Sequence, residues 1–157
     1  MLFLVHHGDA VGPDVDARRP LSERGRAEVE RLAAEAGARG ARPLVVWHSG
    51  KLRARQTAEA FWRVCNALAS FSATRDLQPE DAPEWIRDRL RGETRDILIA
   101  GHYPHLPALL RLLTADIQDI GAPSFPQHGV VALATQDGGK TWTEIWRLEG
   151  LGIGARG

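Results

Sequence analysis

The chain has 157 residues, of which 20 are basic, 20 are acidic and 43% are hydrophobic. This is the length and composition of one ordinary globular domain. A net charge of zero provides no bulk field that would attract nucleic acid or an anionic membrane, so we expect neither as a partner. The single cysteine, Cys65, excludes an internal disulfide and fits a reducing, cytoplasmic location. No apolar run reaches the roughly 18 residues of a membrane span, and we expect no signal peptide.

Three short apolar runs predict buried strands at residues 2–5, 44–47 and 97–100. Continuous apolar runs are typical of parallel strands that are covered on both faces. Two further runs, residues 130–134 and 141–146, flank an Asp-Gly turn signal at residues 136–140. This pattern predicts a β-hairpin near the C-terminus.

Helices are predicted between these strands. Ser22 is a candidate N-cap for a helix that ends near Gly37 or Gly40. Three more helices are expected over residues 53–68, over 83–91 with Pro83 in the first turn, and from Pro104 or Pro107 to 113. The alternation predicts an α/β three-layer sandwich, in which a mostly parallel central sheet is flanked by helices and followed by the C-terminal hairpin. We expect one domain over residues 1–149 and a flexible, glycine-rich tail over 150–157.

Histidines follow the ends of three predicted strands, and such ends meet at the ligand-binding edge of an open α/β sheet. The first strand runs into His6 and His7, the second into His48 and the third into His102. Arg53 lies in the first turn of the next helix, where a cation is unfavourable for the helix dipole. A bound anion would explain its position.

The residues around these positions form four motifs in order. They are Leu4-Val5-His6-His7-Gly8-Asp9-Ala10, Pro20-Leu21-Ser22-Glu23-Arg24-Gly25, Ser49-Gly50-Lys51-Leu52-Arg53-Ala54-Arg55-Gln56-Thr57-Ala58 and Ala100-Gly101-His102. The set resembles the histidine phosphatase superfamily, which includes the cofactor-dependent phosphoglycerate mutases and acid phosphatases. The likeness extends from residue 2 to about residue 115. The short chain and the Gly-Asp-Ala after His7 are most similar to the SixA-type phosphohistidine phosphatases.

The resemblance implies a role for each matching residue. His7 matches the nucleophile, whose neutral imidazole would attack phosphorus and form a phosphohistidine intermediate. Arg53 matches the arginine that holds the phosphate oxygens. His102 matches a second histidine that would stabilise the transferring group in its protonated state. The backbone N–H of Tyr103, at a helix start, would be a further phosphate donor.

Two positions depart from the family pattern. His6 stands where the family has arginine, and Gly50 stands where it usually has proline. A histidine has at most two donors and is charged only near or below its reference pKa of about 6.5. With phosphate bound, His6 is expected to be a cation that binds phosphate less tightly than arginine would and moves the activity optimum to acid pH.

The general acid has three candidates, Glu80, Asp81 and Asp9. SixA-type members lack an evident acid at the usual place. A phosphoramidate whose nitrogen is protonated leaves as a neutral imidazole, so it needs less help than an alkoxide. A missing acid would favour phosphohistidine as the substrate.

These residues predict a metal-independent phosphatase without a cofactor. It would hydrolyse phosphohistidine in proteins, or small phosphomonoesters, through a phosphorylated His7 and release inorganic phosphate. The alternative is a phosphate- or phosphoprotein-binding module whose catalysis is weakened because His6 replaces the family arginine. A histidine metal site is a third reading that lacks a carboxylate at ligand spacing, and His48, His105 and His128 are expected to be structural or on the surface.

Overall fold

Six strands form one sheet in the computed structural model, which describes residues 1–114 and 124–150. Within these residues the strands are β1 (Leu2–His6), β2 (Val45–His48), β3 (Ser70–Ala73), β4 (Ile97–Gly101), β5 (Val130–Ala134) and β6 (Thr143–Leu148). Their order across the sheet is β3-β2-β4-β1-β5-β6. The first four are parallel to one another, and β5 and β6 run antiparallel to their neighbours. The mostly parallel sheet and the C-terminal hairpin are therefore confirmed.

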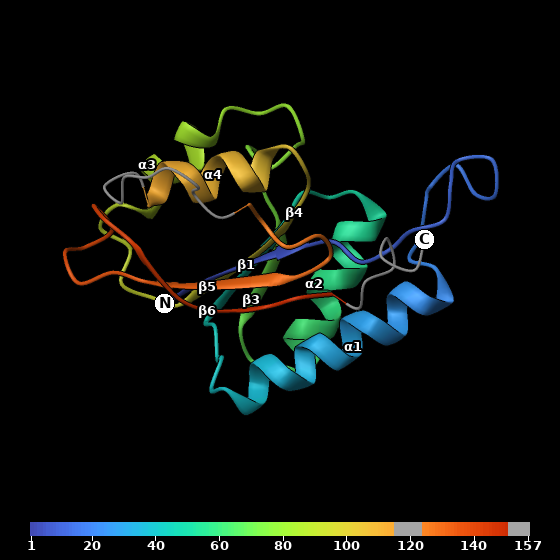
Figure 1. The fold of residues 1–157 in the computed structure, drawn as a ribbon, viewed down its shortest axis with the longest axis horizontal. Helices are drawn as coiled ribbons and strands as arrows, with labels where there is room; N and C mark the ends of the chain where they lie inside the picture. The colour runs from blue at the N-terminus through green and yellow to red at the C-terminus, as the bar shows by residue number, and fades with distance from the viewer. Residues whose placement is uncertain (115–123, 151–157) are drawn as a thin grey trace.

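Helices cover both faces of this sheet (Figure 1). In the described part of the chain they are α1 (Glu23–Ala38), α2 (Leu52–Cys65), α3 (Pro83–Leu90) and α4 (His105–Leu113). Side chains of β1 alternate between the faces: Phe3 and Val5 belong to the core under α1 and α2, whereas Leu2 and Leu4 belong to the core under α3 and α4. All four are almost completely buried. The chain thus has the predicted three layers, with β1 buried between two cores.

The start of α1 lies against the segment that follows β1. Ser22 caps the helix as expected, because its Oγ accepts from the backbone N–H of Gly25 at 2.9 Å. A Cβ atom at Gly25 would lie 2.0 Å from the carbonyl oxygen of Asp9. Only glycine permits this approach, which brings the helix against the backbone two residues after His7.

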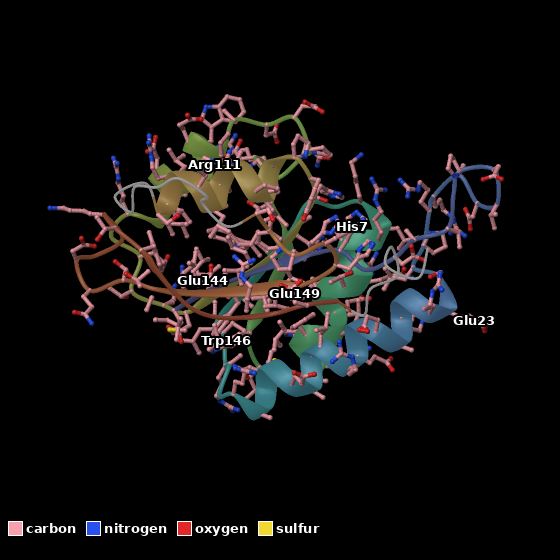
Figure 2. The ribbon with its side chains drawn as sticks, viewed as in Figure 1. His7, Glu23, Arg111, Glu144, Trp146 and Glu149 are labelled. Carbon is pink, nitrogen blue, oxygen red and sulfur yellow. The ribbon has the colours of Figure 1, made fainter. Side chains whose placement is uncertain are left out.

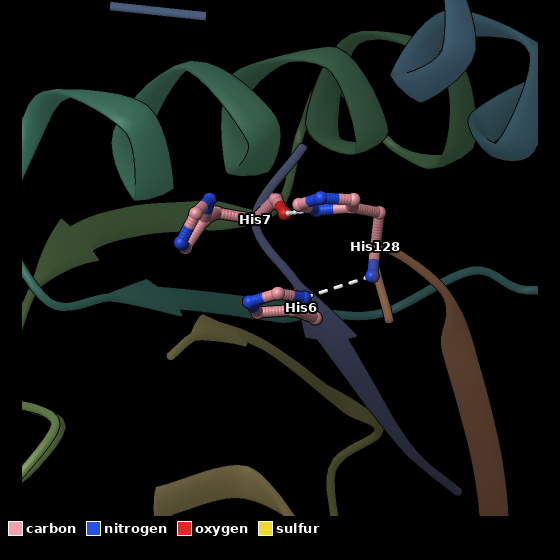
Figure 3. A group of neighbouring side chains, drawn as sticks. All are labelled: His6, His7 and His128. Atoms are coloured by element: carbon pink, nitrogen blue, oxygen red, sulfur yellow. Dashed lines mark hydrogen bonds between the residues drawn. The ribbon is translucent and has the colours of Figure 1, made fainter. Parts of the chain in front are cut away.

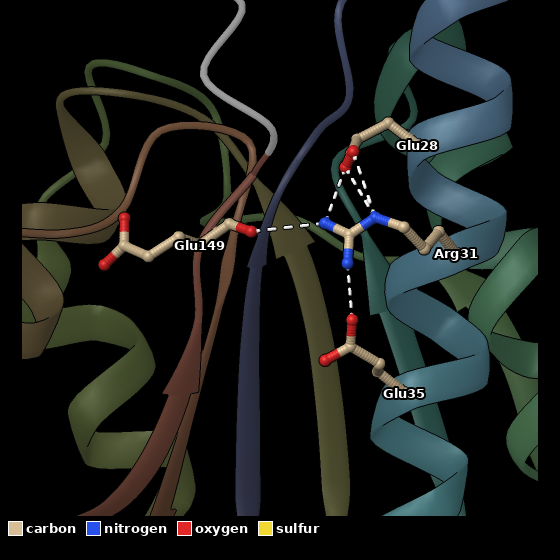
Figure 4. A network of polar contacts seen from close by, with 4 residues as sticks. All are labelled: Glu28, Arg31, Glu35 and Glu149. Carbon is tan, nitrogen blue, oxygen red and sulfur yellow. Dashed lines mark hydrogen bonds and ion pairs between the residues drawn. The ribbon is translucent and has the colours of Figure 1, made fainter. Parts of the chain in front are cut away.

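Arg31 forms ion pairs within α1 and one hydrogen bond to the residue after β6 (Figure 4). The carboxylate of Glu28 accepts from Nε and Nη2 of Arg31, the shorter contact being 2.7 Å. The same guanidinium pairs with Glu35 and donates to the carbonyl oxygen of Glu149 at 3.4 Å. The Glu28 side chain is only 3% exposed, whereas that of Glu35 is 44% exposed. Glu28 is therefore the buried member of this network, whereas its partner Arg31 is 38% exposed and also pairs with Glu35.

Some boundaries differ from the sequence prediction. The strand β3 was not predicted, because Ser70 and Ser72 leave only Phe71 to mark an apolar face. The second helix ends at Cys65 rather than 68, and β6 is shifted to Thr143–Leu148. Residues 151–157 of the expected tail lie outside the described residues. In the described part, no helix combines the length and hydrophobicity needed to cross a membrane.

Candidate active site

The ends of β1 and β4 bring His7 and His102 together, as predicted. The two strands are parallel neighbours, with His6 in register with Gly101, and the backbone N–H of His7 donates to the carbonyl of Gly101 at 3.1 Å. The ring centroids of His7 and His102 lie 5.1 Å apart. Figure 2 shows His7 at the end of the sheet from which the segment after β1 projects. This is the edge where ligands bind in open α/β sheets.

One hydrogen bond fixes the proton of His7. Its Nδ1 lies 2.7 Å from the carbonyl oxygen of Gly8, which can only accept, so Nδ1 carries the hydrogen and Nε2 keeps its lone pair. Burial lowers the pKa of His7 to about 4; the bond to Gly8 opposes this shift and the charge of Arg53 adds to it. At neutral pH the ring is therefore neutral, with a nucleophilic nitrogen at Nε2.

His6 has the opposite arrangement. Its Nδ1 accepts from the backbone N–H of His128 at 2.8 Å, so in the neutral ring the hydrogen is on Nε2 (Figure 3). Burial, followed by the neighbouring His7, lowers the pKa of His6 to about 2. The expected cation at this position is therefore not the form that the unliganded site favours. His6 acts instead as a neutral N–H donor.

His128 is part of the site, which sequence reasoning missed. It precedes β5 with a φ of 55°, and its ring stacks on His6 at 4.8 Å with an interplanar angle of 7°. Its Nδ1 donates to the carbonyl oxygen of His7 at 2.6 Å, which leaves a lone pair on Nε2. Both the backbone and the side chain of His128 thus position the two histidines at the end of β1.

The cluster of His6, His7 and His128 is the group of side chains that offers metal-ligand atoms, all within 4.8 Å of one another. A metal ion requires a lone pair from each imidazole. His7 and His128 present one at Nε2, but the free nitrogen of His6 is an N–H. The set therefore offers two of the three lone pairs that a three-histidine metal site would need, together with one N–H donor from His6.

The helix α2 carries the third matching residue, Arg53, and couples it to the nucleophile. The hydroxyl of Thr57 is fully buried, donates to the carbonyl of Arg53 at 2.8 Å and accepts from the N–H of Gly8 at 3.0 Å. Gln56 accepts from the N–H of Leu21 at 2.8 Å. The spacing Arg53-x-x-Gln56-Thr57 thus has a structural reason, since the last two residues attach α2 to the segment that follows His7.

Two nitrogens near the cluster are buried without a hydrogen-bond partner in the described residues: Nε of Arg53 and Nδ1 of His102. Burial is the main cause that lowers the pKa of both, to about 3 for His102. His102 is thus neutral in the unliganded site, and its protonation beside a transferring phosphoryl group stays a prediction. Its Nε2 lies 2.7 Å from the hydroxyl of Ser49 at the end of β2.

Gly50, which follows Ser49 after the end of β2, has a φ of +94°, which proline cannot adopt. The turn after β2 therefore needs the glycine that departs from the family pattern.

The three candidate general acids differ in their surroundings. Asp9 is engaged, because its Oδ2 accepts from the hydroxyl of Ser22 at 2.7 Å. Asp81 accepts from the N–H of Gln78, whose side chain in turn donates to the carbonyl of Ser49 at 2.7 Å. Glu80 is exposed. Asp81 is therefore the acid with a described link to the strand ends.

Tyr103 was expected to donate its backbone N–H to phosphate, and its side-chain hydroxyl is already used in a hydrogen bond to another part of the chain. The hydroxyl donates to the carbonyl of Phe125, and the ring contacts that of His6 at 4.4 Å. The helix α4 begins two residues later, at His105. His48 packs on Phe71 and accepts from the N–H of Gly50, which is a structural contact.

Arg19 is a second residue that the sequence did not single out. It lies in the segment between β1 and α1 with a φ of 51°, and its Nε donates to the carbonyl of Val11 at 3.0 Å. Its positive charge contributes to lowering the pKa of both His7 and Arg53. The only sign in the sequence was its place next to Pro20, at the start of the second motif.

Comparison with known proteins gives structural relatives only. No protein-family model matches the chain, and no curated protein matches its sequence. A tungstate complex of the protein histidine phosphatase SixA superimposes with a TM-score of 0.81 and 23% identity, over 94% of this chain and 96% of that one. Two proteins described as SixA phosphohistidine phosphatases also match. The one from Agrobacterium tumefaciens has a TM-score of 0.72 and 27% identity, over 94% and 95% of the two chains. The one from Nakamurella multipartitia has a TM-score of 0.74 and 19% identity, over 96% and 95%. The fold of this chain is therefore that of the histidine phosphatase superfamily, and its structural neighbours include the SixA-type phosphohistidine phosphatases.

Proposed function

We propose that the chain is a phosphatase that forms a covalent intermediate on Nε2 of His7. The observation that carries the proposal is the hydrogen bond from Nδ1 of His7 to the carbonyl of Gly8, because it leaves a lone pair on Nε2. The ring of His7 lies beside the rings of His6 and His102, and the charge of Arg53 acts on it. These three neighbours can donate hydrogen bonds, and none of them is a carboxylate. A phosphoryl group is the electrophile that such a set of donors would hold.

The reaction has two displacements at phosphorus. In the first, the lone pair of Nε2 forms a P–N bond to His7 while the bond to the leaving group breaks and its electron pair departs with that group. In the second, the oxygen of a water molecule bonds to phosphorus, the P–N bond breaks, and His7 recovers its lone pair. The proton of the water is released to the phosphate product or to solvent. Arg53 and the N–H of His6 stabilise the phosphoryl oxygens in both steps.

A protein phosphohistidine is the substrate we propose, with small phosphomonoesters as the second choice. A leaving imidazole that already carries its proton needs no strong general acid. Two of the three candidates agree with this, since Asp9 is engaged in the cap of α1 and Glu80 is exposed, whereas Asp81 is linked to the end of β2 through Gln78. The names of the SixA neighbours also support phosphohistidine. We also propose that the enzyme works without a metal ion and in the cytoplasm, where the buried thiol of Cys65 would remain reduced.

The test is phosphate release from a phosphohistidine peptide, in EDTA, by the wild-type chain and by His7→Gln. We expect release by the wild type, none above background by the variant, and a phosphoryl label on His7 that survives base and is lost in acid. The control is His48→Gln, which changes a buried histidine at the neighbouring strand end and should retain most of the activity. Equal release by His7→Gln and the wild type would refute the proposed intermediate.

A second candidate function is a binding module that holds a phosphorylated partner without turning it over. The neutral, buried ring of His6 favours it, because an uncharged donor stabilises a dianionic transition state less than a guanidinium does. The variant His6→Arg separates the two readings. A rise in phosphate release supports an enzyme whose site is otherwise complete, whereas an inert variant that still binds phosphate supports the binding module.

A further inference from the structure

Arg19 stands at the neck of the segment that connects β1 to α1. The two sides of this neck are joined by backbone hydrogen bonds from Val11 to Pro20 at 3.0 Å and from Ser22 to Asp9 at 2.9 Å. Ala10 and Leu21 also form an isolated antiparallel bridge. Arg19 is therefore fixed close to the chain that leaves His7, although it is twelve residues further along the sequence.

The side chain of Arg19 is held at one nitrogen and free at the others. Nε donates to Val11, on the opposite side of the neck, which orients the guanidinium without using its two terminal nitrogens. In the described residues no carboxylate forms an ion pair with Arg19. Its neighbour Arg18 differs, since it is 77% exposed and donates two side-chain hydrogen bonds to Asp16. Arg18 thus has a carboxylate partner and Arg19 does not.

The backbone of Arg19 is strained. A φ of 51° lies in the left-handed region, which costs an ordinary L-residue on the order of 1 kcal/mol. Strain of this kind persists where the surrounding structure enforces it, and it concentrates at functional sites. Glycine or asparagine would satisfy the turn with less strain, so the arginine side chain is what the position retains.

The neck also connects Arg19 to the helix that carries Arg53. The residue two positions later, Leu21, is bonded to Gln56, three residues after Arg53 on α2. The charge of Arg19 is felt by both His7 and Arg53. Two guanidinium groups that repel each other without a carboxylate between them form a place for an anion.

The three imidazoles at the strand ends are neutral in the unliganded site, so positive charge for a phosphoryl dianion comes from Arg53, Lys51 and Arg19, whose charges act on His7 or His102. We propose that Arg19 is the second guanidinium of the site and binds the phosphoryl oxygens of the substrate with its terminal nitrogens. This inference rests on the proposed phosphatase function and adds to it a residue that the sequence motifs do not contain.

The experiment measures the Kd of inorganic phosphate by calorimetry for the wild type, Arg19→Met, Arg19→Lys and the matched control Arg18→Met. Removing a charge-assisted contact is expected to weaken binding about 10- to 100-fold in Arg19→Met. Arg19→Lys keeps the charge but loses the fork, so its Kd should fall between those of the wild type and Arg19→Met. Arg18→Met should bind within about twofold of the wild type. Thermal melting of each variant shows whether it is folded, and the ranking of Lys above Met is not expected from a purely structural role.

The outcomes separate this inference from the proposed function. If the wild type binds phosphate and Arg19→Met binds it equally well, Arg19 has no part in the site, and the chemistry of His7 stands unaffected. If Arg19→Lys is no better than Arg19→Met although both are folded, the positive charge of Arg19 is not what binds the anion. If the wild type neither binds phosphate nor hydrolyses the phosphohistidine peptide, the proposed function fails and the role of Arg19 fails with it.

Discussion

The hydroxyl of Thr57 joins the segment after His7, the proposed nucleophile, to the helix of Arg53, the proposed phosphate ligand, so replacing it tests how the candidate site is held. Thr57→Val keeps the shape of the side chain but leaves the buried N–H of Gly8 without its acceptor at 3.0 Å. An unsatisfied buried donor costs about 1–3 kcal/mol. For a chain of this length, each kcal/mol lowers the melting temperature by about 2–4 °C. We therefore expect a loss of roughly 4–8 °C for a 2 kcal/mol effect.

The activity should fall as well, because the carbonyl of Gly8 holds the tautomer of His7. A cost of about 1.4 kcal/mol in the transition state would lower kcat tenfold. Calorimetric melting and steady-state kinetics of Thr57→Val measure the two effects. Thr114→Val is the matched control, since Thr114 makes the same bond to the carbonyl four residues earlier, at 2.8 Å, in a different helix. Wild-type stability and wild-type kcat in Thr57→Val would refute the argument that this hydroxyl holds the site together.

The site and the helix that supports it lead to four further predictions. The neutral form of His7 is the proposed nucleophile, and its pKa is lowered to about 4. We therefore expect kcat/KM to be constant from about pH 8 to pH 5 and to fall below about pH 4. A rise of kcat/KM toward acid pH would contradict this. The same shift should reduce stability as the pH falls from about 6.5 to 4, since the unfolded chain then binds the extra proton. Gly25→Ala should lower stability by several kcal/mol in chemical denaturation, because its Cβ would meet the carbonyl of Asp9 at 2.0 Å, and a stable variant would show that the helix can move away. Glu28→Gln should cost about 1–3 kcal/mol and Glu35→Gln less than about 0.5, as the two carboxylates differ in burial; equal effects would argue against a buried ion pair.

The strands whose side chains are apolar and buried could be predicted from the sequence. The runs that became β1, β2 and β4 are apolar because helices cover both faces, and their positions were predicted to within a residue or two. The edge strand β3 was missed because backbone hydrogen bonds to β2, rather than apolar side chains, hold it in place. An exposed edge strand leaves little signal in hydrophobic periodicity.

The residues of the candidate site that lie in sequence motifs could be predicted, and those placed by an unusual backbone conformation could not. His7, Arg53 and His102 were found from the resemblance, and β1 and β4 place His7 beside His102. Arg19 and His128 were not found, and both have a positive φ in a connecting segment. A left-handed residue other than glycine leaves no signature in composition or periodicity, because local propensity argues against it. The tautomer of His6 was also not predictable, since it depends on a backbone N–H that belongs to residue 128.

The central position of β1 determines when the site can exist during synthesis. Its residue Leu2 pairs with Ile97 on one side and with Leu133 on the other. Because both partners of β1 lie far downstream, its edges are satisfied only after β4 and β5 have been made. Pairing between such distant segments slows folding and leaves the edges of β1 open meanwhile. A fragment that ends before His128 lacks the contacts that position His6 and His7, so the proposed site forms only after this part of the chain has been made.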